Sequence, residues 1–447
     1  MSVAERYVLA LVLCAACDRL PEAPLAPGAP PALDVVNPAG YDVIDLGTLG
    51  GANTTPAALS DSGQVVGSSQ AADGSTRAFL WEAGTMSEVV LVPPDAAWSS
   101  AQALNNAGRL GGLRSAEDFT GRLFLWDRVT PPGSPALLGQ SSELDAGDFN
   151  GWEYQRLLAI TDGGDVLGQV EAYGQTPRAH ALVWRGGVRT DLGGFNAFQA
   201  GTYASAWNAR EQIVGKSYLY GKGPGPRVYV FHPFLWDDGQ LRDLGVLAQV
   251  RCVDDGTLEC GIGWANDIND QAVVVGSSTD STGLFRAFIW QDGAMRELGA
   301  YPGQTTAALA VNNAGQVLGT YAATYYSGPD GGFVWQDGAA MDLGSLGGGG
   351  TVPVTISEAR EVIGSSLTAD GSQHVFLWRD GQMTDLGAGP IRGRAAVPVA
   401  INARGDVLGM SATCTRTYSG SCYLTSPFHA VLWRKQRPVA MMAARRP

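Results

Sequence analysis

Charged residues are scarce in this chain, and basic ones are the minority among them. Asp, Glu, Lys and Arg make up 16% of the 447 residues, against about 25% in an average soluble protein. Thirty residues are Lys or Arg and 43 are Asp or Glu, so the net charge is -13. Such a chain repels phosphate backbones and anionic headgroups. We therefore expect no nucleic acid partner and no attraction to an anionic membrane surface.

Histidine is scarcer still, and its placement argues against several kinds of enzyme. Each His stands four residues before a Trp in a repeated motif, and the four are His180, His232, His374 and His429. Because these copies fall in separate structural units, the imidazoles cannot gather within about 2.1 Å of one metal ion. The chain also lacks a Gly-x-Ser-x-Gly elbow for a Ser-His-Asp triad. We expect no metal and no cofactor, and predict that each imidazole makes a structural hydrogen bond in its own repeat.

Glycine and apolar residues are what the chain has in quantity. Gly accounts for 60 residues, close to twice the usual share of about 7%. Hydrophobic residues reach 45%, with 12 Trp, 14 Tyr and 13 Phe. So much glycine favours many short strands and tight turns, and the apolar residues suffice for a large core. Disorder is therefore excluded for the bulk of the chain.

The N-terminus has the features of an export signal. Arg6 lies in a short leading segment, and the apolar run at 7–16 is too short to span a bilayer but suits a signal peptide. Residues 14–17 (CAAC) resemble a bacterial lipobox, in which the final Cys is acylated, although Cys14 stands where that pattern usually has Leu. We predict a signal peptide over 1–17 with lipidation of Cys17, which would anchor the chain to a membrane. Ordinary secretion and an uncleaved anchor are the alternatives.

A linker rich in Pro and Ala follows the signal over residues 18–40. Such a composition forms a stiff, extended spacer rather than a domain. The linker supports a tethered protein.

Beyond the linker one motif occurs eight times, at spacings of 43 to 58 residues. Each copy has a short apolar strand that ends in Trp, at Trp81, Trp126, Trp184, Trp236, Trp290, Trp335, Trp378 and Trp433. In six copies an acid follows seven residues later, across a turn such as Asp-Gly, and these acids are Glu88, Asp191, Asp243, Glu297, Asp342 and Asp385. This pattern is typical of a hairpin. We expect the Trp side chains in the core, and the acids as acceptors for turns or backbone N–H groups rather than as a catalytic pair.

A second hairpin precedes each Trp strand, as at 308–321 and 400–411. Asn or Ser opens its turn, and a Gly in the left-handed conformation fits the position that closes it. This Gly is present at Gly108, Gly164, Gly315 and Gly405. Glu211, Ala272 and Arg360 replace it in three copies, where we expect less regular turns.

Four strands per unit of roughly 50 residues, with no helix between units, predict the blades of a β-propeller. A solenoid is the competing architecture. The ends of the repeat favour a closed ring, because the last copy has Ala440 in place of the acid while YDVIDLG at 41–47 is a fourth strand without a preceding Trp strand. We predict a single all-β propeller over 41–436, with eight blades and the N-terminal strand in the last one. Seven blades is the alternative. A basic tail at 437–447 follows the propeller.

The residues that carry the repeat resemble a known family. The segments at 41–51 (YDVIDLGTLGG), 63–69 (GQVVGSS), 77–84 (RAFLWEAG) and 374–389 (HVFLWRDGQMTDLGAG) are similar to the HAF repeats of predicted extracellular bacterial proteins, named for a His-Ala-Phe run. The resemblance covers about 41–436 and implies an extracellular location and repetition, without a particular activity. The His of the family pattern is replaced at Arg77, Arg122, Arg286 and Gly331.

Four cysteines lie outside the signal and form two pairs, each eight residues apart, inside long insertions. They are Cys252 with Cys260, and Cys414 with Cys422. Four cysteines allow three connectivities. Export implies an oxidising compartment, so we favour the two local disulfides, each of which would staple one loop.

Consecutive strands a, b, c and d of a blade alternate in direction, so the a–b and c–d turns share one edge of the ring and the b–c and d–a connections share the other. Apart from Tyr7 and Tyr41, every Tyr lies in or beside the b–c and d–a segments. Tyr recurs in recognition loops because it offers a large contact area and a polar tip. Local packing in long loops is the alternative. The expected ligand contacts are Trp152, Tyr154, Tyr218, Tyr220, Arg227, Tyr229, Tyr321, Tyr325, Tyr326, Tyr418 and Tyr423.

The sequence thus predicts an exported, lipid-anchored, monomeric propeller of the cell envelope or the extracellular space. We expect it to be a surface binding or scaffold module for a carbohydrate or protein ligand, and not an enzyme. A hydrolase or lyase acting on extracellular polysaccharide is the alternative function. Such an enzyme would gather loop carboxylates in one pocket, for instance from Glu117, Asp118, Asp145 and Asp148. A purely structural role is the third.

Overall fold

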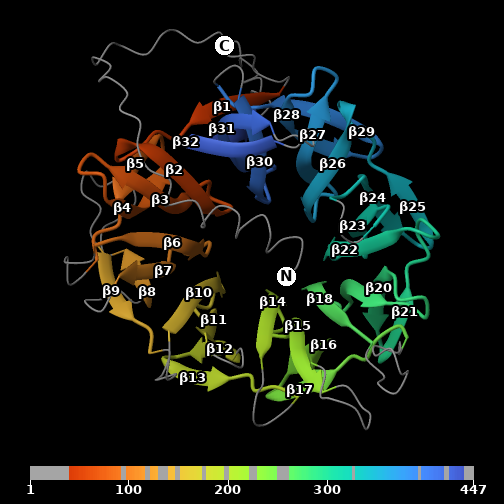
Figure 1. Ribbon diagram of the computed structural model, residues 1–447. Coiled ribbons are helices and arrows are strands. Elements are labelled where there is room, and N and C mark those ends of the chain that lie inside the picture. The colour runs from red at the N-terminus through yellow and green to blue at the C-terminus, as the bar shows by residue number, and fades with distance from the viewer. Residues whose placement is uncertain are drawn as a thin grey trace, which may run out of the picture. The chain divides into compact units, whose positions relative to one another are not determined.

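The computed structural model describes residues 40–91, 97–115, 121–128, 139–145, 152–173, 178–195, 201–220, 229–248, 261–324, 328–390, 394–416 and 422–436. These residues form strands and turns and contain no helix. The strands pair into eight four-stranded antiparallel sheets, which stand around a common axis (Figure 1). This part of the chain is therefore an eight-bladed β-propeller, and the seven-bladed and solenoid alternatives are wrong.

The first four blades follow one another along the chain. Blade 1 consists of β2 (Gly50–Leu59), β3 (Val65–Ala71), β4 (Thr76–Glu82) and β5 (Thr85–Glu88). Blade 2 consists of β6 (Ser99–Leu104), β7 (Leu110–Ser115), β8 (Gly121–Arg128) and β9 (Gly139–Glu143). Blade 3 consists of β10 (Trp152–Ile160), β11 (Val166–Tyr173), β12 (Arg178–Arg185) and β13 (Val188–Asp191). Blade 4 consists of β14 (Thr202–Trp207), β15 (Ile213–Tyr220), β16 (Tyr229–Asp237) and β17 (Gln240–Asp243).

The remaining blades complete the ring. Blade 5 consists of β18 (Gly263–Ile268), β19 (Val274–Thr279), β20 (Phe285–Gln291) and β21 (Ala294–Glu297). Blade 6 consists of β22 (Thr305–Val311), β23 (Val317–Ala322), β24 (Gly331–Gln336) and β25 (Ala339–Asp342). Blade 7 consists of β26 (Gly347–Ile356), β27 (Val362–Thr368), β28 (Gln373–Arg379) and β29 (Gln382–Gly387). Blade 8 consists of β30 (Arg394–Ile401), β31 (Val407–Arg416), β32 (Cys422–Lys435) and β1 (Tyr41–Asp45).

Blade 8 joins the two ends of the described chain. β1 runs antiparallel to β32, with Tyr41 opposite Lys435 and Asp45 opposite Val431. Beyond the strand, the backbone N–H of Leu46 donates to the carbonyl of Ala430 at 3.0 Å. The predicted closure is confirmed, because the N-terminal strand supplies the strand that the last repeat lacks.

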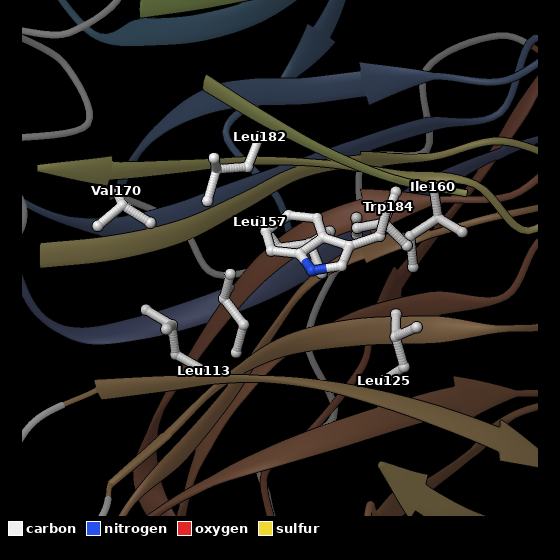
Figure 2. Packing of buried hydrophobic residues seen from close by; sticks show 10 residues of the cluster. Leu113, Leu125, Leu157, Ile160, Val170, Leu182 and Trp184 are labelled. Carbon is white, nitrogen blue, oxygen red and sulfur yellow. The ribbon is translucent and has the colours of Figure 1, made fainter. Parts of the chain in front are cut away.

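The hydrophobic core is divided among the eight junctions between neighbouring blades. Between blades 2 and 3, Leu125 shares a cluster with Trp184 (Figure 2). The junction that closes the ring is built in the same way, from Leu432 of blade 8 and Trp81 of blade 1. Seven of the eight repeat Trp side chains are buried as predicted, and Trp335 is half-buried.

The a–b turns are uniform around the ring, and the expectation of three irregular ones is wrong. Glu211, Ala272 and Arg360 adopt φ values of 64°, 61° and 63°, inside the left-handed region that Gly occupies in the other copies. In blade 5 the turn-opening Asn269 accepts the N–H of Ala272 on its backbone carbonyl, and its side-chain Oδ1 accepts the N–H of Val273 at 2.9 Å. These bonds hold the left-handed residue in place although its Cβ strains that conformation by about 1–2 kcal/mol.

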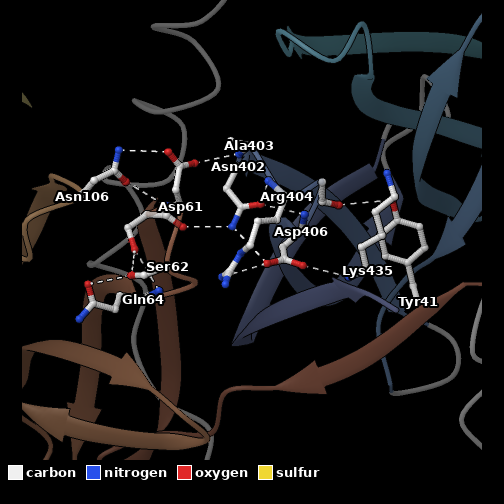
Figure 3. A network of polar contacts seen from close by, with 12 residues as sticks. Tyr41, Asp61, Ser62, Gln64, Asn106, Asn402, Ala403, Arg404, Asp406 and Lys435 are labelled. Carbon is white, nitrogen blue, oxygen red and sulfur yellow. Dashed lines mark hydrogen bonds and ion pairs between the residues drawn. The ribbon is translucent and has the colours of Figure 1, made fainter. Parts of the chain in front are cut away.

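Neighbouring a–b turns are also bonded to each other. At the closing junction, the amide of Asn402 in blade 8 donates to the carbonyl of Ser60 in blade 1 at 3.0 Å (Figure 3). The N–H of Ala403 donates to Asp61 Oδ1 at 2.8 Å. Equivalent pairs of bonds join blade 2 to 3, 4 to 5, 5 to 6 and 6 to 7. One polar rim therefore runs across most junctions, including the one where the chain ends meet.

Each inner strand carries a β-bulge at the same place, which the sequence pattern did not reveal. The register skips one residue in every a strand. The skipped residues are Ala57, Gln102, Leu158, Ser205, Asn266, Leu309, Val354 and Val399. Figure 1 places inner strands such as β14, β18, β22 and β30 toward the centre of the ring. A bulge bends and twists a strand locally, which suits strands that converge there.

The left-handed turn position provides a reciprocal test. Ala272→Gly should raise the free energy of unfolding by about 0.5–1 kcal/mol, because Gly reaches this conformation without strain. Gly315→Ala, at the same position of the next blade, should lower it by about 1 kcal/mol. A Cβ at residue 315 would meet no atom within 4 Å, so backbone strain alone acts there. Urea unfolding measures both changes, and equal signs for the two variants would contradict the prediction.

Candidate functional site

The two edges of the ring differ in character. We call the ends of strands b and d, the starts of strands a and c, and the connections between them the loop edge. Partly exposed aromatic side chains lie there at Trp98, Tyr154, Phe195, Tyr203, Tyr218, Phe231, Trp264, Phe285, Tyr301, Tyr321 and Phe428. The opposite edge, formed by the a–b and c–d turns, is the turn edge, and its described turns contain no aromatic residue. Most of the partly exposed aromatic side chains of the described chain therefore lie on the loop edge, whereas Trp207 and Trp335 lie where an a strand and a c strand end at the turn edge.

The structure describes the side chains of three predicted ligand contacts, Tyr154, Tyr218 and Tyr321, and all three lie on the loop edge. Only the backbone is described at Trp152, Tyr220, Tyr229 and Tyr423, where β10, β15, β16 and β32 begin or end at this edge. Arg227, Tyr325, Tyr326 and Tyr418 lie outside the described residues. Their role in ligand contact stays a prediction.

The predicted covalent features fall mostly outside the described chain. Cys17, Cys252 and Cys260 are not among the described residues. Cys414 and Cys422 lie on neighbouring strands, opposite Leu424 and Arg416, and their side chains are not described. Lipidation and both disulfides stay predictions.

Every blade carries an acid at the same place on its outer strand, opposite the Phe position of the Trp strand. The predicted structural hydrogen bond of each His is confirmed, and its partner is this acid. Nδ1 and the carboxylate are 2.7 to 3.0 Å apart in His180–Asp191, His232–Asp243, His374–Asp385 and His429–Asp45. The last pair joins β32 to β1, so it closes the ring. Arg77, Arg122 and Arg286 take the place of the imidazole beside Glu88, Glu143 and Glu297.

The acids of the Asp-Leu-Gly segments also accept a backbone N–H, as predicted. Asp191 Oδ1 accepts the N–H of Gly193 at 2.9 Å, while Oδ2 faces His180. Burial alone would raise the pKa of Asp191, but the bonds from His180 and Gly193 outweigh burial and hold the pKa below its ordinary value. In five blades the basic residue and the acid are 11 residues apart, and this spacing was the signal for the pairing.

Blade 6 departs from this arrangement, because Gly331 stands where the other blades have His or Arg. The phenols of Tyr301 and Tyr321 instead donate to Asp342 Oδ2 at 2.9 and 2.7 Å. Their rings stack with centroids 4.0 Å apart and an interplanar angle of 17°. A Cβ at Gly331 would collide with the ring of Tyr321, which fills the space of the missing side chain. Burial and the carboxylate of Asp342 raise the pKa of Tyr321 to about 12, so its phenol stays protonated.

The connection that carries Tyr301 is held by a buried guanidinium. Arg286 donates to the carbonyls of Ala300 and Tyr301 at 3.0 and 3.1 Å, and also to the carbonyl of Gln304. Its Nε donates to Glu297 at 2.7 Å. Tyr301 has a φ of 48°, a left-handed conformation that costs a non-Gly residue about 1–3 kcal/mol. These hydrogen bonds from Arg286 hold Tyr301 in its left-handed conformation and so position its ring against Tyr321.

Two further aromatic groups lie on the loop edge of blades 4 and 5. Tyr218 packs on Phe231 with centroids 4.0 Å apart, and the ammonium of Lys216 lies 5.2 Å from the ring centroid of Tyr203. In blade 5 the Trp264 and Phe285 rings lie 4.8 Å apart. Tyr203 and Trp264 occupy equivalent inner-strand positions, two residues before the skipped residue of the bulge. Three consecutive blades thus present aromatic surface at this edge.

Metal ligands and the acids considered for catalysis were sought among the described residues. They contain no group of three His, Cys, Asp or Glu side chains placed to hold a metal ion. Of the carboxylates considered for catalysis, Glu117, Asp118 and Asp148 lie outside the described residues, and Asp145 is exposed. Within the described ranges no helix is long and apolar enough to cross a membrane.

One inner-strand carboxylate is electrostatically unusual. Asp267 follows the bulge of β18, where the other blades have Ala or Thr. Its Oδ2 accepts the N–H of Val311 in blade 6 at 2.8 Å, and Oδ1 accepts the N–H of Ile268. Burial outweighs these two bonds, and with the charge of Glu358 it raises the pKa of Asp267 to about 7. The side chain ties blade 5 to blade 6 while holding its proton up to near-neutral pH.

Comparisons with known proteins give no family for this chain. No protein-family model matches the chain, and no curated protein matches it, so the similarity to HAF repeats stays a prediction. Among solved structures, the match to the β-propeller domain of the Trilobed protease from Pyrococcus furiosus covers 74% of this chain and 96% of that one, with 11% identity and a TM-score of 0.46.

Two other similar structures are named as a hydrolase and as a lectin. A puromycin hydrolase is 13% identical with a TM-score of 0.47, and the match covers 83% of this chain but only 60% of the hydrolase. The Aleuria aurantia lectin is 11% identical with a TM-score of 0.29, and the match covers 64% of this chain and 94% of the lectin. Identities and TM-scores this low assign no activity to this chain.

The raised pKa of Asp267 predicts a specific pH dependence. Between the ordinary value of 3.8 and about 7 the folded chain binds one proton more than the unfolded chain. The contribution of Asp267 to stability is therefore largest below about pH 4 and is lost as the pH rises through 7. Asp267→Asn removes the titrating group. From pH 5 to pH 8 the free energy of unfolding of the variant, relative to that of the wild type, should therefore rise by about 1–3 kcal/mol. Urea unfolding across this range measures the difference, and a constant difference would rule the prediction out.

Proposed function

We propose that this chain is a binding or scaffold module that recognises an extracellular carbohydrate or protein through the loop edge of its propeller. Export and anchoring at Cys17 are part of the proposal, and they rest on the sequence of residues 1–17. The ligand would meet a protein held away from the membrane by the linker at 18–40.

The difference between the two edges carries the proposal. On the turn edge, the a–b turns are alike from blade to blade, and at five junctions polar groups of neighbouring a–b turns are bonded to each other rather than left for a partner. The loop edge varies from blade to blade and carries most of the partly exposed aromatic side chains. Recognition surfaces on repeat proteins form where insertions and side chains vary over a constant scaffold.

The aromatic groups of blades 4 to 6 suit such a role. Tyr218, Trp264 and Tyr301 each pack against another ring, which fixes their orientation before any ligand arrives. A side chain already held in place loses little conformational entropy on binding. No observation favours a polysaccharide hydrolase over this function, because seven of the outer-strand acids are engaged by a basic side chain of their own blade.

A screen of the purified full chain against glycans, cell-wall polymers and envelope proteins tests the proposal. For the best ligand, the double variant Tyr218→Ala with Trp264→Ala should weaken binding at least about tenfold, because half-exposed aromatic anchors contribute strongly to interfaces. Val188→Ala is the control, since Val188 is 68% exposed and lies on β13 away from the loop edge.

Thermal melting of both variants separates lost binding from lost folding. Binding that is unchanged in the folded double variant, or weakened equally by Val188→Ala, would contradict recognition at the loop edge. If the chain bound none of the ligand classes, a purely structural role would explain the protein better than a binding function.

A further inference from the structure

The acid of blade 6 differs from its seven counterparts in lacking a basic side chain as its partner. Seven outer-strand acids have a His or Arg of their own blade within ion-pair distance. Asp342 has hydrogen bonds but no ion pair within the described part of the chain. Its carboxylate is exposed at the loop edge. Blade 6 therefore presents a negative charge that the repeat elsewhere pairs with a basic side chain.

The partners that Asp342 does have are neutral donors. Tyr301 and Tyr321 donate to Oδ2, and the N–H of Gly344 donates to Oδ1 at 2.7 Å. Because both phenol hydrogens are used inside the group, the two phenol oxygens and the carboxylate offer only acceptor lone pairs to a ligand. Such a group accepts hydrogen bonds from a cation and repels an anion.

The group is also fixed in advance. The stack of Tyr301 on Tyr321 depends on the left-handed backbone of Tyr301, which Arg286 holds through three carbonyls of the same connection. Gly331 is required as well, since a side chain there would displace Tyr321. Blade 6 thus differs from the other blades in two linked ways. Gly replaces the basic residue, and two tyrosines fill the space and bond the acid.

We propose that Asp342, Tyr301 and Tyr321 form a recognition site for the guanidinium of an arginine side chain on a partner polypeptide. The same position in blade 5 already pairs a carboxylate with a guanidinium, at 2.7 Å between Arg286 Nε and Glu297 Oε1. A planar guanidinium can bond a carboxylate and lie against an aromatic ring at once, which an ammonium does less well. The net charge of -13 favours a basic partner. This site rests on the proposed function in one respect only, namely that both place the partner at the loop edge.

Titration calorimetry of the full chain with the peptide acetyl-Arg-Arg-Arg-amide at low salt tests this site. The wild type should bind, and Asp342→Asn should weaken binding by about tenfold or more, since hydrogen bonds between two charged groups are the strong ones. Asp337→Asn is the matched control. It removes the same charge from the same blade at an exposed c–d turn, where φ is 51° and Asn is tolerated, so it should leave binding unchanged.

A second variant rebuilds the repeat. Gly331→His together with Tyr321→Ala restores a basic side chain beside Asp342 and removes the ring that would clash with it, so it should abolish peptide binding while the fold is kept. Acetyl-Lys-Lys-Lys-amide should bind the wild type more weakly than the arginine peptide.

Three results would overturn the site: no binding of the arginine peptide, equal losses in Asp342→Asn and Asp337→Asn, or retained binding in the rebuilt blade. Equal losses would indicate attraction by net charge alone. These outcomes are independent of the polymer screen, which uses other ligands and alters Tyr218 and Trp264, so failure of this site and failure of the proposed function are distinguishable.

Discussion

The pairing of β1 with β32 is the constraint on which the whole ring depends. Seven blades are formed by continuous stretches of chain, and only blade 8 requires two segments separated by most of the sequence. Three kinds of contact meet where the chain ends join: strand pairing from Tyr41 to Asp45, the hydrogen bond between His429 and Asp45, and the turn bonds from blade 8 to Ser60 and Asp61. Once the ring is closed, each junction between blades buries its own cluster of apolar side chains, and no sheet remains without neighbours.

The same polar pair accompanies that apolar packing in seven of the eight blades. The basic residue before the Phe position and the acid of the outer strand fix the last strand of the blade to the Trp strand, and the Asp-Leu-Gly acids also order the connection to the next blade. These groups are partly exposed, so each pair contributes only about 0–1 kcal/mol to stability. The pairs instead fix the register of the outer strand, because the two side chains meet only when this strand is aligned as observed. Blade 6 shows that the pair can be replaced, by two phenols in place of one cation.

Much of this architecture could be predicted because it is repeated. Eight Trp strands, the Asp-Gly turns and the orphan strand at 41–47 sufficed for blade number and closure. Glu211, Ala272 and Arg360 were misjudged because local propensity was weighed without the turn-opening Asn or Ser, whose bonds outweigh the strain. The bulges left no trace in the sequence, since Ala57, Gln102 and Val354 share no side-chain property.

The candidate site was only partly foreseen. The distribution of Tyr indicated the loop edge, and Tyr321 was among the expected contacts. Asp342 was taken as one more repeated acid, and the loss of its basic partner at Gly331 was noticed only as a departure from a family pattern. What the sequence could not supply was Tyr301, whose contribution depends on a left-handed backbone held by Arg286 from another strand.

The position of β1 also determines how the ring responds to mechanical load. Gln436 donates a backbone hydrogen bond to the carbonyl of Gly40, so both ends of the described chain leave the ring at one point. Tension applied to the chain ahead of Tyr41 would act first on β1 and, through β1, on blade 8, which is built from two separate segments of chain. A pull across the strand direction breaks its bonds to β32 one at a time, whereas a pull along the strand loads all of them together and is resisted far more strongly. The direction of the pull would thus decide whether the ring opens at its seam or moves as a rigid body.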